Sequence, residues 1–123
     1  MGKHTPMSRI QVTTRFIGVH LWASAPDEVA FLRNLHRHVF KVNATCEVTH
    51  DDRELEFFMV CQHIDTFIKG TFDSYHANMP STLYLGPASC EMLARMVQTM
   101  LSDVYHRPFS VMVREDEENA GIV

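Results

Sequence analysis

The sequence predicts an α+β domain in which an antiparallel β-sheet carries two helices on one face, in the order ββααββ. Two long segments, 9–22 and 36–49, alternate between apolar and polar residues, which is the pattern of half-buried strands. A third segment, 89–105, has apolar residues at helical spacing, and 109–115 alternates again. Strands on either side of a helical region are typical of the α+β class.

The composition predicts one domain and excludes several classes of function. Of the 123 residues, 46% are hydrophobic, so we expect residues 1–8 to be flexible and 9–123 to form a single domain. The net charge of −4 argues against a nucleic-acid partner. No apolar run reaches membrane-spanning length, and the first residues lack the apolar stretch of a signal peptide. Three cysteines without paired spacing indicate a reducing compartment, so we expect a cytoplasmic protein.

The two long strands each place histidines on their apolar face. In the first strand, alternation groups His20 with Ile10, Val12, Thr14, Phe16 and Gly18. In the second strand, His36 and His38 share a face with Phe40, Val42, Ala44, Cys46 and Val48. The opposite face of the second strand carries mostly charged and polar residues, so we expect it to face solvent.

The middle of the chain predicts one helix and one loop. Residues 62–72 favour a helix that ends near Gly70, whereas 53–61 fit either a strand or the beginning of that helix. Segment 73–87 is interpreted as a loop, because proline and glycine punctuate it at Pro80, Gly86 and Pro87.

The segment 89–105 is the best-defined helix. Its apolar residues recur at helical spacing: Met92, Leu93, Met96, Val97, Met100, Leu101 and Val104. Ser89 is a candidate N-cap, and Pro108 ends the segment. The methionines form a stripe that we expect to pack in the core. After the strand 109–115, only residues 120–123 remain for a closing strand.

Three histidines are expected to meet at one end of the sheet. His36 and His38 lie two apart on a strand, so their side chains point the same way, and His20 ends the preceding strand. If the two strands pair as antiparallel neighbours, the end of the first lies beside the start of the second. Three neutral imidazoles are the ligand set of a catalytic zinc, although copper, iron and nickel also accept them. The alternative is three hydrogen-bonded core histidines without a metal.

Four segments in the same order resemble the 6-pyruvoyltetrahydropterin synthase family, which includes the bacterial 6-carboxytetrahydropterin synthases. The family's first strand ends in Phe-x-x-x-His and its second opens with Leu-His-Gly-His. A Pro-Thr-Ser-Glu motif begins its helix, and its third strand ends in Glu. The matching segments here are 16–20 (FIGVH), 35–42 (LHRHVFKV), 87–94 (PASCEMLA) and 111–115 (VMVRE).

The resemblance implies a fold, a cofactor and a substrate class. It implies the tunnelling fold, in which the subunits of a homo-oligomer (trimer, tetramer or hexamer) join their sheets into a barrel. It implies zinc at His20, His36 and His38, and a role in tetrahydropterin or queuosine biosynthesis. Glu115 would anchor the amino-pyrimidine edge of a pterin, because a carboxylate accepts two parallel N–H bonds from such an edge. A plain surface acid is the alternative for Glu115.

The resemblance fails at the family's catalytic residues. No cysteine lies between His20 and His36, where the family's synthases have one. The family's Asp-His pair is represented by Asp73 and, displaced by two positions, His76. We expect these two residues to move protons, with His63 as a further candidate, whereas Cys61 and Cys90 are interpreted as buried structural thiols.

Three hypotheses therefore stay open. The first is a zinc-dependent lyase acting on 7,8-dihydroneopterin triphosphate or a related pterin or purine. The second is a homologue of the same fold that binds metal and pterin without turnover. The third is a structural oligomer whose histidines belong to the core.

Overall fold

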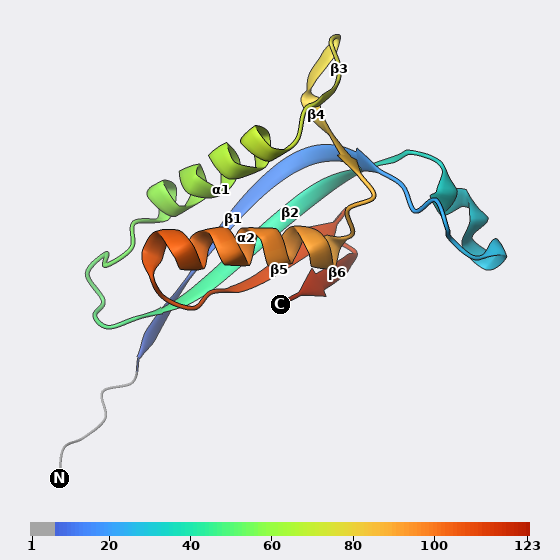
Figure 1. The fold of residues 1–123 in the computed structure, drawn as a ribbon. Coiled ribbons are helices and arrows are strands. Elements are labelled where there is room, and N and C mark those ends of the chain that lie inside the picture. Colours follow the sequence, from blue (N-terminus) through green and yellow to red (C-terminus); the bar gives the residue numbers. More distant parts are fainter. Residues whose placement is uncertain (1–6) are drawn as a thin grey trace.

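The computed structural model describes residues 7–123 and confirms the α+β class (Figure 1). Its six strands form one sheet in the order β3-β4-β1-β2-β5-β6. The first strand begins at Ser8, one residue before the expected start of the domain, and residues 1–6 of the expected flexible segment lie outside the described residues. In chain order the elements are β1 (Ser8–His20), the 3-10 helix η1 (Asp27–Arg33), β2 (His36–Val48), α1 (Phe57–Thr71), β3 (Ser74–His76), β4 (Met79–Gly86), α2 (Cys90–Tyr105), β5 (Ser110–Glu115) and β6 (Asn119–Ile122).

Strands β1 and β2 form the long antiparallel pair that the alternation predicts. The pairing sets His20 opposite His36 and Gly18 opposite His38, so the end of β1 lies beside the start of β2. Burial follows the predicted alternation, since Phe40, Val42 and the following alternate residues of β2 are buried between more exposed neighbours. The prediction that the histidines share the apolar face is confirmed.

The sheet is mixed, so the prediction of a purely antiparallel sheet is wrong. Residues 79–86 form β4, which runs parallel to β1 and sets Ile17 opposite Thr82. The loop predicted for 73–87 is instead the hairpin of β3 and β4, and it projects beyond the rest of the sheet (Figure 1). Proline is tolerated at the outer part of an edge hairpin, so Pro80 marks the beginning of a strand here rather than a loop.

Both helices cover the face of the sheet that carries the apolar side chains, as predicted. Residues of α1 and α2 join those of β1, β2 and β5 in one buried cluster. Of the ambiguous segment 53–61, residues 57–61 begin α1, because the Glu56 carboxylate accepts hydrogen bonds from the Phe58 and Met59 amides and caps the helix. On the opposite face, residues 7–123 place no helix over the strands (Figure 1).

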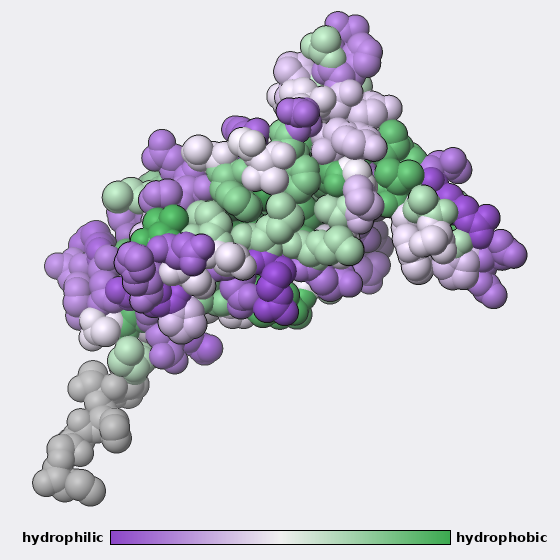
Figure 2. All heavy atoms as spheres, in the orientation of Figure 1, coloured by the Kyte–Doolittle hydropathy of each residue, from purple (hydrophilic) through white to green (hydrophobic). Residues whose placement is uncertain are grey.

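Helix α2 has one buried face and one apolar exposed face. Leu93, Val97 and Leu101 are fully buried, whereas Met92 is 56% exposed. The prediction that the methionine stripe packs in the core is therefore wrong at Met92. The outer face forms a groove against α1, where apolar side chains gather in the space-filling view (Figure 2); its apolar lining residues are Phe67, Met92, Met96, Met100 and Val104.

The start of α2 is held by its N-cap and by the closing strand. The Ser89 hydroxyl accepts a hydrogen bond from the Met92 amide, as the sequence predicts. Strand β6 passes so close to this turn that a Cβ atom at Gly121 would lie 2.5 Å from the Glu91 backbone nitrogen. Only glycine permits this approach, which fixes the first turn of α2 beside the end of the sheet.

Among the described residues, no helix combines the length and apolar character needed to span a membrane. The three cysteines, Cys46, Cys61 and Cys90, are free.

Candidate metal centre

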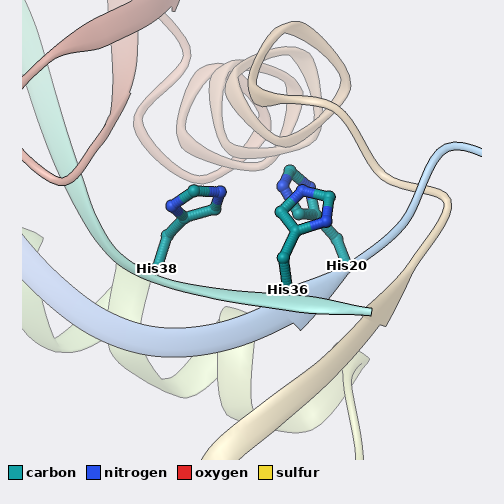
Figure 3. Close-up of side chains that lie close together, drawn as sticks. All are labelled: His20, His36 and His38. Carbon is teal, nitrogen blue, oxygen red and sulfur yellow. The ribbon is translucent and has the colours of Figure 1, made fainter. Parts of the chain in front are cut away.

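The three predicted histidines lie together at the end of the sheet, as Figure 3 shows. One ring nitrogen from each lies within 4.8 Å of the others. Their ring centroids are 4.5 Å apart for His20 and His36, 5.1 Å for His36 and His38, and 5.2 Å for His20 and His38. The register of β1 and β2 produces this cluster, because it pairs His20 with His36 and brings His38 to the same face.

Each imidazole is held through its Nδ1 atom by a hydrogen-bond acceptor. His20 Nδ1 lies 2.8 Å from the Ala88 carbonyl oxygen, and His36 Nδ1 lies 2.8 Å from that of Asn34. His38 Nδ1 contacts a carboxylate oxygen of Asp116. The acceptors come from three separate places: the turn before α2, the end of η1, and the turn after β5.

These contacts determine the tautomer of each ring. Carbonyl and carboxylate oxygens only accept hydrogen bonds, so Nδ1 carries the proton, and in the neutral ring Nε2 keeps its lone pair. Orienting a ligand histidine through its second nitrogen in this way is the usual arrangement around protein-bound metals. His20 Nε2 is buried without a hydrogen-bond partner among the described residues, as expected of a nitrogen reserved for an ion. Burial also lowers the pKa of His20, which favours the neutral, metal-binding ring.

Asp116 is a supporting residue that the sequence analysis did not identify. One carboxylate oxygen accepts from His38, and the other accepts from the Val39 amide at 2.8 Å. The hydrogen bonds from His38 and then Val39 lower the pKa of Asp116, so the carboxylate stays ionised. Its backbone has a φ of 52°, a left-handed conformation that aspartate and asparagine tolerate.

Glu115 lies at the same end of the sheet and faces the histidines. It ends β5 opposite Phe40, and its Oε2 atom is 3.5 Å from the Nε2 atoms of both His20 and His38. The Cys90 thiol donates to the same oxygen at 3.7 Å. Burial, reinforced by Glu115, raises the pKa of Cys90 to about 12, so this sulfur remains a thiol near neutral pH.

A cleft of about 450 Å³ opens beside the cluster. The β4–α2 turn, the start of α2 and the β1–η1 loop form its walls, with Trp22 half exposed. A concave, largely apolar cleft with a few polar groups is typical of small-molecule sites. Within the described part of the chain, no lysine or arginine lines it. The lining residues that matter below are His20, Trp22, His36, Cys90, Glu91 and Glu115.

The predicted proton-transfer residues lie elsewhere in this chain. Asp73 and His76 are exposed, and both belong to the hairpin region that projects from the sheet (Figure 1). The His76 ring accepts from the Asn78 amide, and His63 on α1 contacts the Tyr105 hydroxyl. None of the three lines the cleft. Their catalytic role therefore stays a prediction.

The donor set fits a first-row divalent metal. Three imidazole nitrogens suit zinc, copper, iron and nickel, and the tetrahedral preference of zinc accommodates three histidines with one further ligand. The Nδ1 contacts already hold the three rings in place, so binding an ion would not require β1 or β2 to move. The cluster could therefore bind such an ion, and the donor set alone does not select which one.

Comparison with known proteins shows a similar fold and no family. The crystal structure of the uncharacterized protein WS1659 from Wolinella succinogenes is similar, with a TM-score of 0.62 over 97% of this chain and 98% of that one. The two sequences are 12% identical, so the similarity concerns the fold alone. No protein-family model matches the sequence, and no curated protein matches it either.

Proposed function

We propose that this chain is a zinc-dependent, pterin synthase-like lyase with the tunnelling fold, acting on 7,8-dihydroneopterin triphosphate or a related pterin or purine. The observation that carries the proposal is the convergence of His20, His36 and His38, each held through Nδ1 so that Nε2 is left to bind an ion. The four segments that resemble the pterin synthases support the choice of substrate class.

The chain's own residues would bind and orient the substrate. Zinc held by the three histidines would act as a Lewis acid for an oxygen of the substrate's side chain. The Glu115 carboxylate would accept the paired N–H donors of an amino-pyrimidine edge. The half-exposed Trp22 offers an aromatic surface on which a planar ring can pack.

Proton transfer by Asp73 and His76 belongs to the proposal as well. Because neither residue lines the cleft of its own chain, a neighbouring subunit or a movement of the hairpin would have to bring them there. The short strands β3 and β6 form the two edges of the sheet, and Ile122 on β6 is 67% exposed. These edges support assembly into a homo-oligomeric barrel. A cytoplasmic location is supported by the free cysteines.

A second candidate function is metal and pterin binding without turnover. Three observations favour it: Asp73 and His76 lie outside the cleft, the raised pKa of Cys90 keeps it a thiol that cannot accept a proton near neutral pH, and no lysine or arginine lines the described cleft to bind a triphosphate. The same fold and metal site would then serve for binding alone.

Metal analysis of protein purified without a histidine tag tests the proposed site. We expect about one equivalent of zinc per chain in the wild type and none in a His36→Ala/His38→Ala variant. His50→Ala is the control, because this exposed histidine contacts Glu54, away from the cluster. Unchanged metal content in the double variant would refute the site.

A substrate assay then separates the two candidate functions. We expect the metal-loaded protein to consume 7,8-dihydroneopterin triphosphate, and titration with the same compound measures binding independently. Binding without consumption would identify the second candidate. Absence of both from metal-loaded protein would contradict a pterin role.

A further inference from the structure

Glu115 stands at the distance from two of the three histidines, His20 and His38, that a shared metal ion would require. Its Oε2 atom lies 3.5 Å from His20 Nε2 and 3.5 Å from His38 Nε2. Zinc binds nitrogen and oxygen at about 2.0–2.1 Å, so neighbouring ligand atoms of a tetrahedral site are roughly 3.4 Å apart. The observed separations match the edges of such a tetrahedron. They are longer than the 2.7–2.9 Å that is typical of a direct charge-assisted hydrogen bond.

The arrangement of these atoms favours a cation between them. The Nδ1 protons of His20 and His38 already point at Ala88 and Asp116, so each Nε2 presents a lone pair. An ionised carboxylate also presents only lone pairs. The Glu115 oxygen faces each of these nitrogens from 3.5 Å, and lone pairs at that separation repel unless a positive charge lies near them.

The placement of Glu115 is fixed by the fold on two sides. Strand β5 pairs with β2, which sets Glu115 beside Phe40 and two residues along β2 from His38. From α2, the Cys90 thiol donates to Oε2 at 3.7 Å and directs this oxygen toward the histidines. The next residue, Asp116, orients the His38 ring. Residues 115 and 116 thus support the same centre from one turn.

We infer that Glu115 is the fourth ligand of the metal in the substrate-free protein, so that three imidazoles and one carboxylate close the site. The inference rests on the proposed metal site and adds a gate to it. Closed four-ligand sets are typical of structural zinc, whereas catalytic zinc keeps a position for water or substrate. A substrate oxygen must therefore displace the Glu115 carboxylate, which then becomes free to meet the ring of the same substrate.

Variants of Glu115 test this inference through metal binding rather than turnover. We expect Glu115→Gln and Glu115→Ala to lower zinc affinity on the order of tenfold or more, measured by competition with a chromophoric chelator. The matched control is Glu118→Gln, which removes a carboxylate from the same turn without touching the cluster. Circular dichroism establishes that each variant is folded. Wild-type affinity in both folded Glu115 variants would overturn the inference.

Cobalt substitution gives a second measurement that does not depend on the variants' stability. In the Co²⁺-loaded wild type, added azide is expected to leave the visible absorption unchanged, because the fourth position is taken. In Glu115→Ala, azide is expected to bind and shift the spectrum. Azide binding to the wild type at the same concentrations as to Glu115→Ala would overturn the inference. Retention of metal by the His36→Ala/His38→Ala variant would instead refute the three-histidine site itself.

Discussion

His38 and Asp116 are 78 positions apart in the sequence and share a hydrogen bond from the imidazole Nδ1 to the carboxylate. This contact fixes the tautomer and the orientation of a metal-binding ring. We predict that Asp116→Asn weakens zinc binding by about 10–100-fold, the usual effect of removing such a partner. An amide NH₂ facing Nδ1 would favour the tautomer whose Nε2 carries the proton.

The Asp116 variant is expected to fold normally. Asparagine tolerates the left-handed backbone of residue 116, and its oxygen can still accept from the Val39 amide. Asp103→Asn, an exposed change on α2, is the control. Chelator competition that gives the same zinc affinity for Asp116→Asn and wild type would show that the carboxylate has no part in the site.

We expect the Glu54 carboxylate to make the stability of the protein depend on pH in the acid range. Its carboxylate accepts from the Thr49 hydroxyl and from the Arg107 guanidinium, and also from the Thr49 amide at 2.9 Å. The Thr49 hydroxyl, followed by Arg107, lowers the pKa of Glu54 from 4.5 to about 2. A lowered folded pKa stabilises the protein above the unfolded pKa, and this contribution disappears as the pH falls from about 4.5 through 2.

We therefore predict that Glu54→Gln unfolds at a lower temperature than the wild type at pH 7, and that the difference narrows toward pH 2. Melting curves between pH 2 and 7, recorded with a chelator present, measure it. In a protein that already carries Arg107→Gln, adding Glu54→Gln should lower the melting temperature by less at pH 7. Arg107 is one of the groups that lower the pKa of Glu54, and this variant lacks it. A difference that stays constant with pH would contradict the assignment to Glu54.

Two glycines give a matched pair for testing the approach of β6 to α2. A Cβ at Gly121 would lie 2.5 Å from the Glu91 nitrogen, whereas a Cβ at Gly70 in α1 meets nothing within 4 Å. We predict that Gly121→Ala lowers the free energy of unfolding by about 1–3 kcal/mol, because backbone must shift. Gly70→Ala should raise it by about 0.4–1 kcal/mol. Urea denaturation measures both, and equal effects would contradict the close approach.

Adjacent residues of α2 test which side of the helix is the core. Leu93 is fully buried, and Met92 is 56% exposed. We predict that Leu93→Ala lowers the free energy of unfolding by about 2–5 kcal/mol. Met92→Ala should change it by less than about 0.5 kcal/mol. A large loss at Met92 in the same denaturation experiment would show that the outer groove is covered in solution.

The histidine cluster could be predicted from the sequence because its causes are local. Alternation fixes which face His36 and His38 occupy, and pairing of consecutive strands brings His20 beside them. Helix α2 could be predicted for the same reason, since its N-cap and its apolar spacing lie within one segment. The nature of the metal depends on competition among similar ions, so three imidazoles alone do not determine it.

The remaining features depend on contacts between distant segments. Strand β4 pairs with β1, although η1, β2, α1 and β3 lie between them in the chain, and no periodicity in residues 79–86 indicates which strand is its partner. Asp116 lies in an acidic run that reads as a solvated turn, yet it contacts β2. The left-handed backbone of Asp116 and its hydrogen bonds to His38 and Val39 depend on the pairing of β5 with β2, which the sequence alone does not specify.

The parallel pairing of β1 and β4 also governs how this chain acquires its native state. Pairing β1 with β2 closes a loop of residues 21–35. Pairing Ile17 with Thr82 closes a much longer loop, which costs more conformational entropy. Pairings between segments far apart in the sequence slow folding, because the chain loses conformational entropy before the stabilising contacts form. The Ala88 carbonyl follows β4 in the chain, so we expect the His20 ring to acquire its partner only when β4 has docked.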